Sequence, residues 1–222
     1  MEIWLDTCDQ ETIETAQRLG ILYGITTNPA LLAQAKEDHD KVITRLLEAQ
    51  EGPIAVQVTA WNAEDMIRQA VALRSLSDRI IVKIPVVQEG LAAMNDLVQK
   101  QIPVMATAVF DPNQALLAAI AGADYVAPYF GRMLDAGLEA HAALEAMAAI
   151  YQKNQFKTKL LAAALRTTDH ITSCALLGIH AVTIKSKLFG EFIANNPSTL
   201  HSLREFAEEW DVCEHQTLAA LS

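Results

Sequence analysis

One lysine lies in a segment that is otherwise apolar. Lys83 is the only charged residue among residues 80–87, which read Ile-Ile-Val-Lys-Ile-Pro-Val-Val. Burial there would strip the ammonium of its hydration, lower its pKa and make neutral amine available near neutral pH. A neutral amine can attack a ketone and form a Schiff base. The side chain can equally extend its charged end to solvent from a strand end, and this segment alone favours neither interpretation.

Polar side chains also follow other short apolar runs of the chain. They are Asp6, Thr26, Asn28, Gln57, Thr107, Tyr129, Arg132, Arg166 and Lys185. If the runs are parallel strands of one barrel, their carboxyl ends meet at one face, where barrel enzymes carry their active sites. A chain that needed only a packed core would not require a polar group at nearly every strand end.

Each of these residues also has an ordinary structural interpretation. Asp6 could cap a helix, and Asn28 before Pro29 could mark a turn or a helix start. Gln57 and Thr107 could be hydrogen-bonding residues of the core. The tyrosine could serve packing alone, and the two arginines could be surface salt-bridge partners, although arginines also suit a phosphate.

The elements that must position these groups alternate along the chain. The short apolar runs are expected as strands at residues 3–6, 23–26, 54–58, 80–84, 104–109, 125–127, 159–163 and 181–184. The amphipathic stretches are expected as helices at residues 9–19, 38–49, 63–76, 90–101, 112–121, 136–151, 168–177 and 187–194. Such alternation implies parallel strands joined by crossovers, and the sequence therefore predicts an α/β fold, a single (β/α)8 TIM barrel. A doubly wound open sheet is the alternative.

Residues 197–222 remain after these units. They predict an extra C-terminal amphipathic helix, whose apolar positions are Leu200, Leu203, Phe206, Trp210 and Cys213. This stripe must be buried, either across its own barrel or on a neighbouring subunit. We therefore expect one domain over residues 1–222, in which residues 197–222 form this extra helix, and the stripe alone does not decide between the two packing surfaces.

The composition excludes several classes of protein. The net charge of −10 and the pI of about 5.0 argue against a nucleic-acid or anionic-membrane partner. No apolar run approaches the roughly 18 residues of a membrane helix, and the N-terminus lacks the pattern of a secretion signal. The three cysteines are far apart and the histidines lack metal-ligand spacing, so we expect a reducing, cytoplasmic compartment and neither a metal nor a cofactor.

A set of short segments spans almost the whole chain in order. They are Leu5-Asp6-Thr7, Gly24-Ile25-Thr26-Thr27-Asn28-Pro29, Val56-Gln57-Val58, Ile81-Val82-Lys83-Ile84-Pro85, Gly90-Leu91-Ala92-Ala93, Thr107-Ala108-Val109, the stretch from Gly122 through Tyr129 to Arg132, and Leu161-Ala162-Ala163. Together they resemble the small transaldolase-like proteins and, within them, the fructose-6-phosphate aldolases. The pairing of Gly-Ile-Thr-Thr-Asn-Pro with a later Val-Lys-Ile-Pro is specific to this group.

The resemblance implies roles for the strand-end residues. Lys83 would be the Schiff-base lysine, Asp6 and Asn28 would hold the hydroxyls of a dihydroxyacetone unit, and Thr26 would line the same pocket. Transaldolases hold the catalytic water with a Glu and have a Phe nearby, whereas the aldolases have a Gln and a Tyr. This chain has Gln57 and Tyr129, which with Thr107 would position the water, as in the aldolase subgroup.

One departure from the family pattern concerns the phosphate of the acceptor. Ala164 stands where the family has a phosphate-contacting serine. Arg132, Arg166 and Lys185 would offset the missing hydroxyl, because barrel phosphate sites commonly form after the seventh and eighth strands. The family resemblance further implies that residues 197–222 are an oligomerisation helix, which exchanges between subunits in a pentamer or a ring-like decamer.

These observations predict a class I aldolase that adds dihydroxyacetone reversibly to glyceraldehyde 3-phosphate or a related aldehyde. Its partners would be small ketose and aldehyde substrates. A transaldolase that moves the same three-carbon unit between sugar phosphates is the nearest alternative. A non-catalytic sugar-phosphate binding protein is the alternative from another class.

Overall fold

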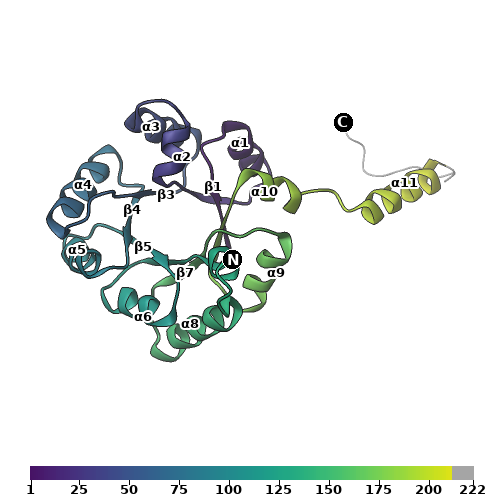
Figure 1. The fold of residues 1–222 in the computed structure, drawn as a ribbon. Coiled ribbons are helices and arrows are strands. Elements are labelled where there is room, and N and C mark those ends of the chain that lie inside the picture. The colour runs from purple at the N-terminus through teal and green to yellow at the C-terminus, as the bar shows by residue number, and fades with distance from the viewer. Residues whose placement is uncertain (212–222) are drawn as a thin grey trace. The chain divides into compact units, whose positions relative to one another are not determined.

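The structure of the chain, a computed structural model, describes residues 1–211. Its parallel strands form a closed barrel in which each strand pairs with the next and β8 pairs with β1 (Figure 1). The strands are β1 (Glu2–Asp6), β2 (Leu22–Thr26), β3 (Ile54–Gln57), β4 (Ile80–Pro85), β5 (Val104–Val109), β6 (Tyr125–Pro128), β7 (Lys159–Ala162) and β8 (Ala181–Ile184). The predicted (β/α)8 architecture is therefore confirmed, and the open sheet is excluded.

Helices surround the barrel, as the view along its axis shows (Figure 1). They are α1 (Gln10–Arg18), α2 (Pro29–Gln34), α3 (His39–Ala49), α4 (Ala63–Leu76), α5 (Gln88–Gln99), α6 (Pro112–Ile120), α7 (Phe130–Asp135), α8 (Ala140–Asn154), α9 (Thr168–Leu176) and α10 (Ser186–Phe192). The predicted starts at Asp9 and Pro112 are confirmed: Asp9 caps α1 by accepting a hydrogen bond from the Thr12 amide, and Pro112 opens α6.

Two short helices were missed by the sequence pattern, and one helix start was wrong. The six-residue helices α2 and α7 each begin within three residues of a strand end. The helix expected at residues 136–151 begins at Ala140 instead, because Gly137 adopts a left-handed φ of +70° and ends the preceding turn.

The barrel interior follows the two-residue period of its strands. Its buried core is one cluster made of Trp4, Ala55, Ile81, Met105, Tyr125, Ala127, Leu161, Ala163 and Ala181. Gly24 completes this layer on β2, since a Cβ there would lie 2.9 Å from the Trp4 ring. On each strand, the side chain two residues after the core member also points into the barrel and lies closer to the carboxyl end of the strand.

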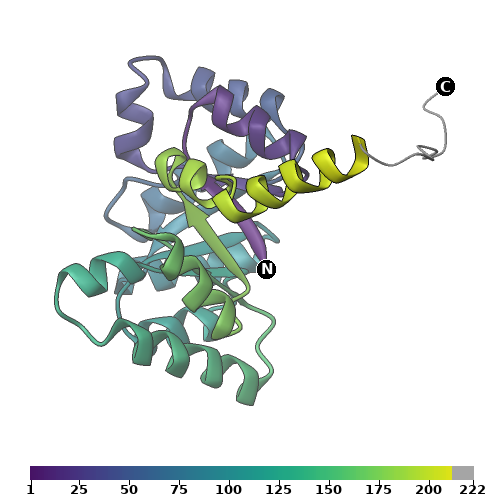
Figure 2. The same cartoon turned by 90° about the vertical axis from the view of Figure 1, so that its right-hand side faces the viewer.

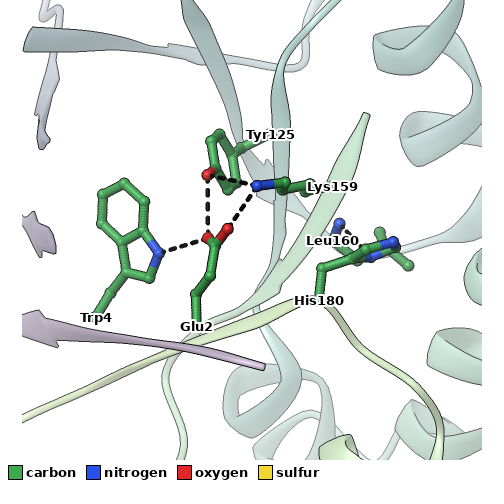
Figure 3. A network of polar contacts seen from close by, with 6 residues as sticks. All are labelled: Glu2, Trp4, Tyr125, Lys159, Leu160 and His180. Atoms are coloured by element: carbon green, nitrogen blue, oxygen red, sulfur yellow. Dashed lines mark hydrogen bonds and ion pairs between the residues drawn. The ribbon is translucent and has the colours of Figure 1, made fainter. Parts of the chain in front are cut away.

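The amino end of the barrel is closed by a polar network (Figure 3). The Glu2 carboxylate accepts hydrogen bonds from the Trp4 indole at 3.1 Å, the Tyr125 hydroxyl at 3.0 Å and the Lys159 ammonium at 2.5 Å. Nearby, His180 Nδ1 accepts the Leu160 amide at 3.2 Å. These contacts join β1, β6, β7 and the start of β8.

The described chain separates into two compact units, the first covering Met1–Phe189 and the second beginning at Gly190. Figure 2 shows the first unit from the side, with β1 in purple next to β8 in green. The second unit contains α11 (Pro197–Asp211), which confirms helical structure for the first part of the predicted tail. Cys213, which was expected on the same stripe, lies outside the described residues. No helix in residues 1–211 is long and apolar enough to cross a membrane.

Candidate active site

The alternation of the strands places a polar layer above the apolar core. The members of this layer each lie two residues after a member of the apolar core. They are Asp6 (after Trp4), Gln57 (after Ala55), Lys83 (after Ile81), Thr107 (after Met105), Tyr129 (after Ala127) and Thr183 (after Ala181). Thr26 occupies the matching position two residues beyond Gly24 on β2. Because side chains two apart on a strand share one face, this layer lies at the carboxyl end of the barrel.

Lys83 is buried in this layer, with 6% of its surface exposed. Its Nζ donates a hydrogen bond to the Thr27 carbonyl at 2.8 Å, from the end of β2. Desolvation lowers the pKa of Lys83 from 10.5 to about 8, although the charge of Asp6 acts in the opposite direction. The interpretation of Lys83 as a lysine that extends to solvent is therefore wrong. The lowered pKa increases the share of neutral amine near neutral pH, and the neutral amine is the form that attacks carbonyls.

Asp6 receives two hydrogen bonds on one carboxylate oxygen. Its Oδ1 accepts from Thr26 Oγ1 at 3.2 Å and from Asn28 Nδ2 at 3.3 Å. Asn28 also caps α2, because its Oδ1 accepts from the Leu31 amide at 3.0 Å. The structural and functional interpretations of Asn28 are therefore compatible, since different atoms of one amide serve them. Asp6 itself is no helix cap, a role that falls to Asp9 in α1.

A second pair of side chains comes from Thr107 on β5 and from Tyr129, the residue directly after β6. The Thr107 and Tyr129 hydroxyl oxygens are 3.0 Å apart. The strand register shifts between Ala106 and Val109, where Ala108 has a left-handed φ of +57°. Such an irregularity at a strand end re-aims neighbouring side chains, here next to the polar layer. Gln57 is the register partner of Lys83 across the β3–β4 pair, so both belong to one stretch of barrel wall.

The predicted cationic residues differ in what they contact. The Arg132 guanidinium stacks over the Tyr129 ring at 4.7 Å, which links it to the polar layer. Arg166 forms an exposed ion pair with Asp135 at 2.7 Å, the ordinary role considered for it. Lys185 lies exposed directly after β8, and among residues 1–211 it shares no contact partner with either arginine.

The backbone around Ala164 is tightly constrained. Ala164 has a left-handed φ of +61°. A Cβ placed on Gly131 would lie 1.8 Å from the Ala164 carbonyl oxygen, so only glycine fits at the start of α7. Ala164, which stands where the family has a serine, therefore lies at a point where the backbone after β7 closely approaches the start of α7.

The sequence interpretation missed one residue of the layer, Thr183, and one backbone contact, that of Thr27 with Lys83. Thr183 Oγ1 lies 2.7 Å from Thr26 Oγ1, and both side chains are buried. Thr183 is the one polar residue of β8, a signal of the kind that singled out Lys83. The acceptor for Lys83 is a backbone carbonyl, that of Thr27, which no pattern of side chains could indicate.

No group of three or more His, Cys, Asp or Glu side chains that could hold a metal ion occurs within residues 1–211. The layer instead offers a buried amine, a carboxylate, an amide and hydroxyls at the carboxyl end of a closed parallel barrel. This is the organisation of a (β/α)8-barrel enzyme.

Comparison with known proteins gives the family. Residues 3–221 match the family described as transaldolase/fructose-6-phosphate aldolase. Three similar proteins are named probable transaldolase: one from Carboxydothermus hydrogenoformans, 37% identical over 210 residues; one from Streptococcus equi subsp. zooepidemicus, 36% identical over 210 residues; and one from Chlorobium phaeobacteroides, 36% identical over 222 residues. The first two alignments cover 95% of this chain and 98% of the relative, and the third covers 96% and 99%. The chain belongs to the transaldolase/fructose-6-phosphate aldolase family and is an enzyme of that type.

Proposed function

We propose that this protein is a class I aldolase of the fructose-6-phosphate aldolase type, with Lys83 as the Schiff-base nucleophile. The observation that carries the proposal is a buried lysine with its pKa lowered to about 8, at the carboxyl end of the barrel. Such an amine serves nucleophilic catalysis near neutral pH without help from a metal or a cofactor. Its substrates are small ketoses and aldehydes.

The reaction begins with addition of the Lys83 amine to the ketone of dihydroxyacetone. Loss of water gives an iminium ion, and removal of a proton from the adjacent carbon gives an enamine. The enamine carbon then forms a bond to the carbonyl carbon of the aldehyde, and hydrolysis of the new iminium releases the ketose and the free amine. The Asp6 carboxylate favours the iminium by its charge, while Asn28 and Thr26 line the pocket for the donor hydroxyls.

Proton transfer is assigned to Tyr129 with a water molecule held by Gln57 and Thr107. A Gln side chain has no titratable proton, so it can orient water but cannot act as acid and base. The Tyr129 hydroxyl, 3.0 Å from that of Thr107, is the group that can exchange a proton. This combination supports an aldolase over a transaldolase.

A phosphorylated acceptor is favoured by the cations near the barrel mouth. Arg132 lies over Tyr129, so an anion bound by Arg132 would lie near the reacting carbons. The side chains of Arg166 and Lys185, which are solvent-exposed, would turn toward the bound phosphate and complete the site. The ion pair between Arg166 and Asp135 is exposed and therefore costs little to break.

Transaldolase activity is the second candidate, since the similar proteins are named probable transaldolases. A panel of donors and acceptors separates the two activities. We expect free dihydroxyacetone to serve as donor with glyceraldehyde 3-phosphate as acceptor. Product formation only from a sugar-phosphate donor would instead establish a transaldolase, and no turnover of any kind would favour a non-catalytic binding protein. Equal efficiency with glyceraldehyde and its 3-phosphate would refute the proposed phosphate site.

We further propose that the protein acts in the cytoplasm as a homo-oligomer, a pentamer or a decamer, with residues 1–222 as one functional domain. The helix predicted at residues 197–222 would dock on a neighbouring subunit through its apolar stripe. Exposure of 56% at Leu203 and 61% at Phe206 in α11 supports such a docking role.

A further inference from the structure

Three side chains from neighbouring strands form a connected row in the polar layer. The hydroxyl oxygens of Thr183 on β8 and Thr26 on β2 are 2.7 Å apart, and Thr26 Oγ1 is 3.2 Å from Asp6 Oδ1 on β1, which lies between them in the barrel wall. Thr183 is 5% exposed and Thr26 is 1% exposed. Hydrogen bonds in such a dry environment are stronger, and unpaired groups cost more, than on the surface.

The direction of these hydrogen bonds follows from counting protons. A hydroxyl has one proton to donate, whereas an ionised carboxylate can only accept. The Thr26 hydroxyl therefore donates its one proton to Asp6 Oδ1, and so it accepts a hydrogen bond from the Thr183 hydroxyl. The reverse direction, with Thr26 donating to Thr183, would leave Asp6 Oδ1 with Asn28 as its remaining described donor and the buried Thr183 proton without a described acceptor.

We propose that Thr183 is a positioning residue for Asp6, which acts by fixing the Thr26 hydroxyl as a donor to Asp6 Oδ1. The inference rests on the proposed function, in which Asp6 serves the iminium and the donor hydroxyls. Thr26 and Asn28 both donate to Asp6 Oδ1. In this proposal the other carboxylate oxygen, Oδ2, is the one that contacts a ligand. Thr183 thereby extends the site to β8 without touching the substrate.

The hydroxyl can be removed with little change of shape by Thr183→Val, while Thr183→Ser keeps it. The rate of borohydride trapping of dihydroxyacetone at Lys83, followed by mass spectrometry, reports on imine formation. We expect Thr183→Val to slow trapping about fivefold to tenfold, the value of one buried hydrogen bond, and Thr183→Ser to restore most of the rate. Thr183→Ala removes the same hydroxyl if valine prevents folding, and Thr158→Val, a buried threonine just before β7, is the matched control.

A double-mutant cycle tests whether the effect passes through Thr26. In a Thr26→Val background, Thr183→Val should slow trapping no further. An undiminished effect in that background, or a wild-type rate for Thr183→Val alone, would overturn the inference. A wild-type protein that gives no trapped adduct would refute the proposed function itself, so the two failures are distinct.

Discussion

At the scale of single residues, the chemistry depends on the charge state of Lys83. Its pKa is lowered to about 8 by desolvation, and the Asp6 charge opposes this shift. The rate of imine formation should therefore rise with pH along a limb centred near pH 8, as neutral amine replaces ammonium. Asp6→Asn removes the opposing charge, so the pKa of Lys83 should fall and the limb should move to lower pH.

Trapping rates measured from pH 6 to pH 10 would locate this limb. Asp9→Asn, which changes an exposed carboxylate and keeps a good helix cap, is the control and should leave the limb in place. A limb in Asp6→Asn that stays fixed or moves to higher pH would show that Asp6 does not act on Lys83 through its charge.

Tyr129 offers a second test at this scale. Tyr129→Phe removes only the hydroxyl that would carry the proton, so turnover should fall at least about 100-fold while the thermal midpoint changes little. Tyr151→Phe removes another buried hydroxyl, which donates to the Ala115 carbonyl at 2.8 Å, and should keep full turnover. Full activity in Tyr129→Phe would refute the assignment of the proton to this residue.

The sequence predicted the types and strand positions of these residues but not their protonation or partners. The burial of Lys83 depends on strands that are distant in the chain, and its acceptor is the backbone of Thr27. The ion pair of Arg166 with Asp135 likewise required knowledge of where α7 and β7 meet. Thr183 could have been found, since it interrupts an apolar strand just as Lys83 does.

At the scale of elements, the two ends of the barrel have different tasks. The polar network around Glu2 at the amino end joins β1, β6 and β7, and residues at this face of a barrel serve stability rather than catalysis (Figure 3). Glu2→Gln should therefore lower the free energy of unfolding by about 1–3 kcal/mol, because Lys159 and Tyr125 lose a charged acceptor. The trapping rate at Lys83 should not change.

The pH dependence of this loss has a definite sign. Hydrogen bonding to Glu2 raises the pKa of Lys159 in the folded protein, and burial raises the pKa of Tyr125. Both groups favour folding in their protonated forms, so their stabilisation is present at neutral pH and is lost as the pH rises above about 10. Urea unfolding of wild type and Glu2→Gln should converge there. A constant difference, or an equal loss in the exposed control Glu51→Gln, would contradict this role of Glu2.

The order of the elements was largely predictable because hydrophobic period and capping residues agree along the chain. The exceptions were α2 and α7, which have six residues each, too few to show a helical period. The approach of Gly131 to the Ala164 carbonyl also had no signal in the sequence, since a glycine near a helix start has several possible causes.

At the scale of the whole molecule, the proposed role of the helical tail is to hold subunits together. The double substitution Leu203→Glu and Phe206→Glu would place charge on the apolar stripe of α11. We expect wild type to have five or ten times the chain mass of 24.2 kDa in solution, and the double variant to have a lower mass. The control Ser198→Glu and His201→Glu adds charge on the opposite side of the helix and should leave the assembly intact. Light scattering coupled to size exclusion measures both. A monomeric wild-type protein would contradict the proposed oligomer.

The central claim is that Lys83 forms a Schiff base with a three-carbon ketone. Borohydride reduction in the presence of dihydroxyacetone, followed by peptide mass spectrometry, tests it most directly. We predict that the reduced adduct is found on the peptide that contains Lys83, and that it disappears in Lys83→Met. No adduct, or an adduct on another lysine that persists in Lys83→Met, would contradict the account.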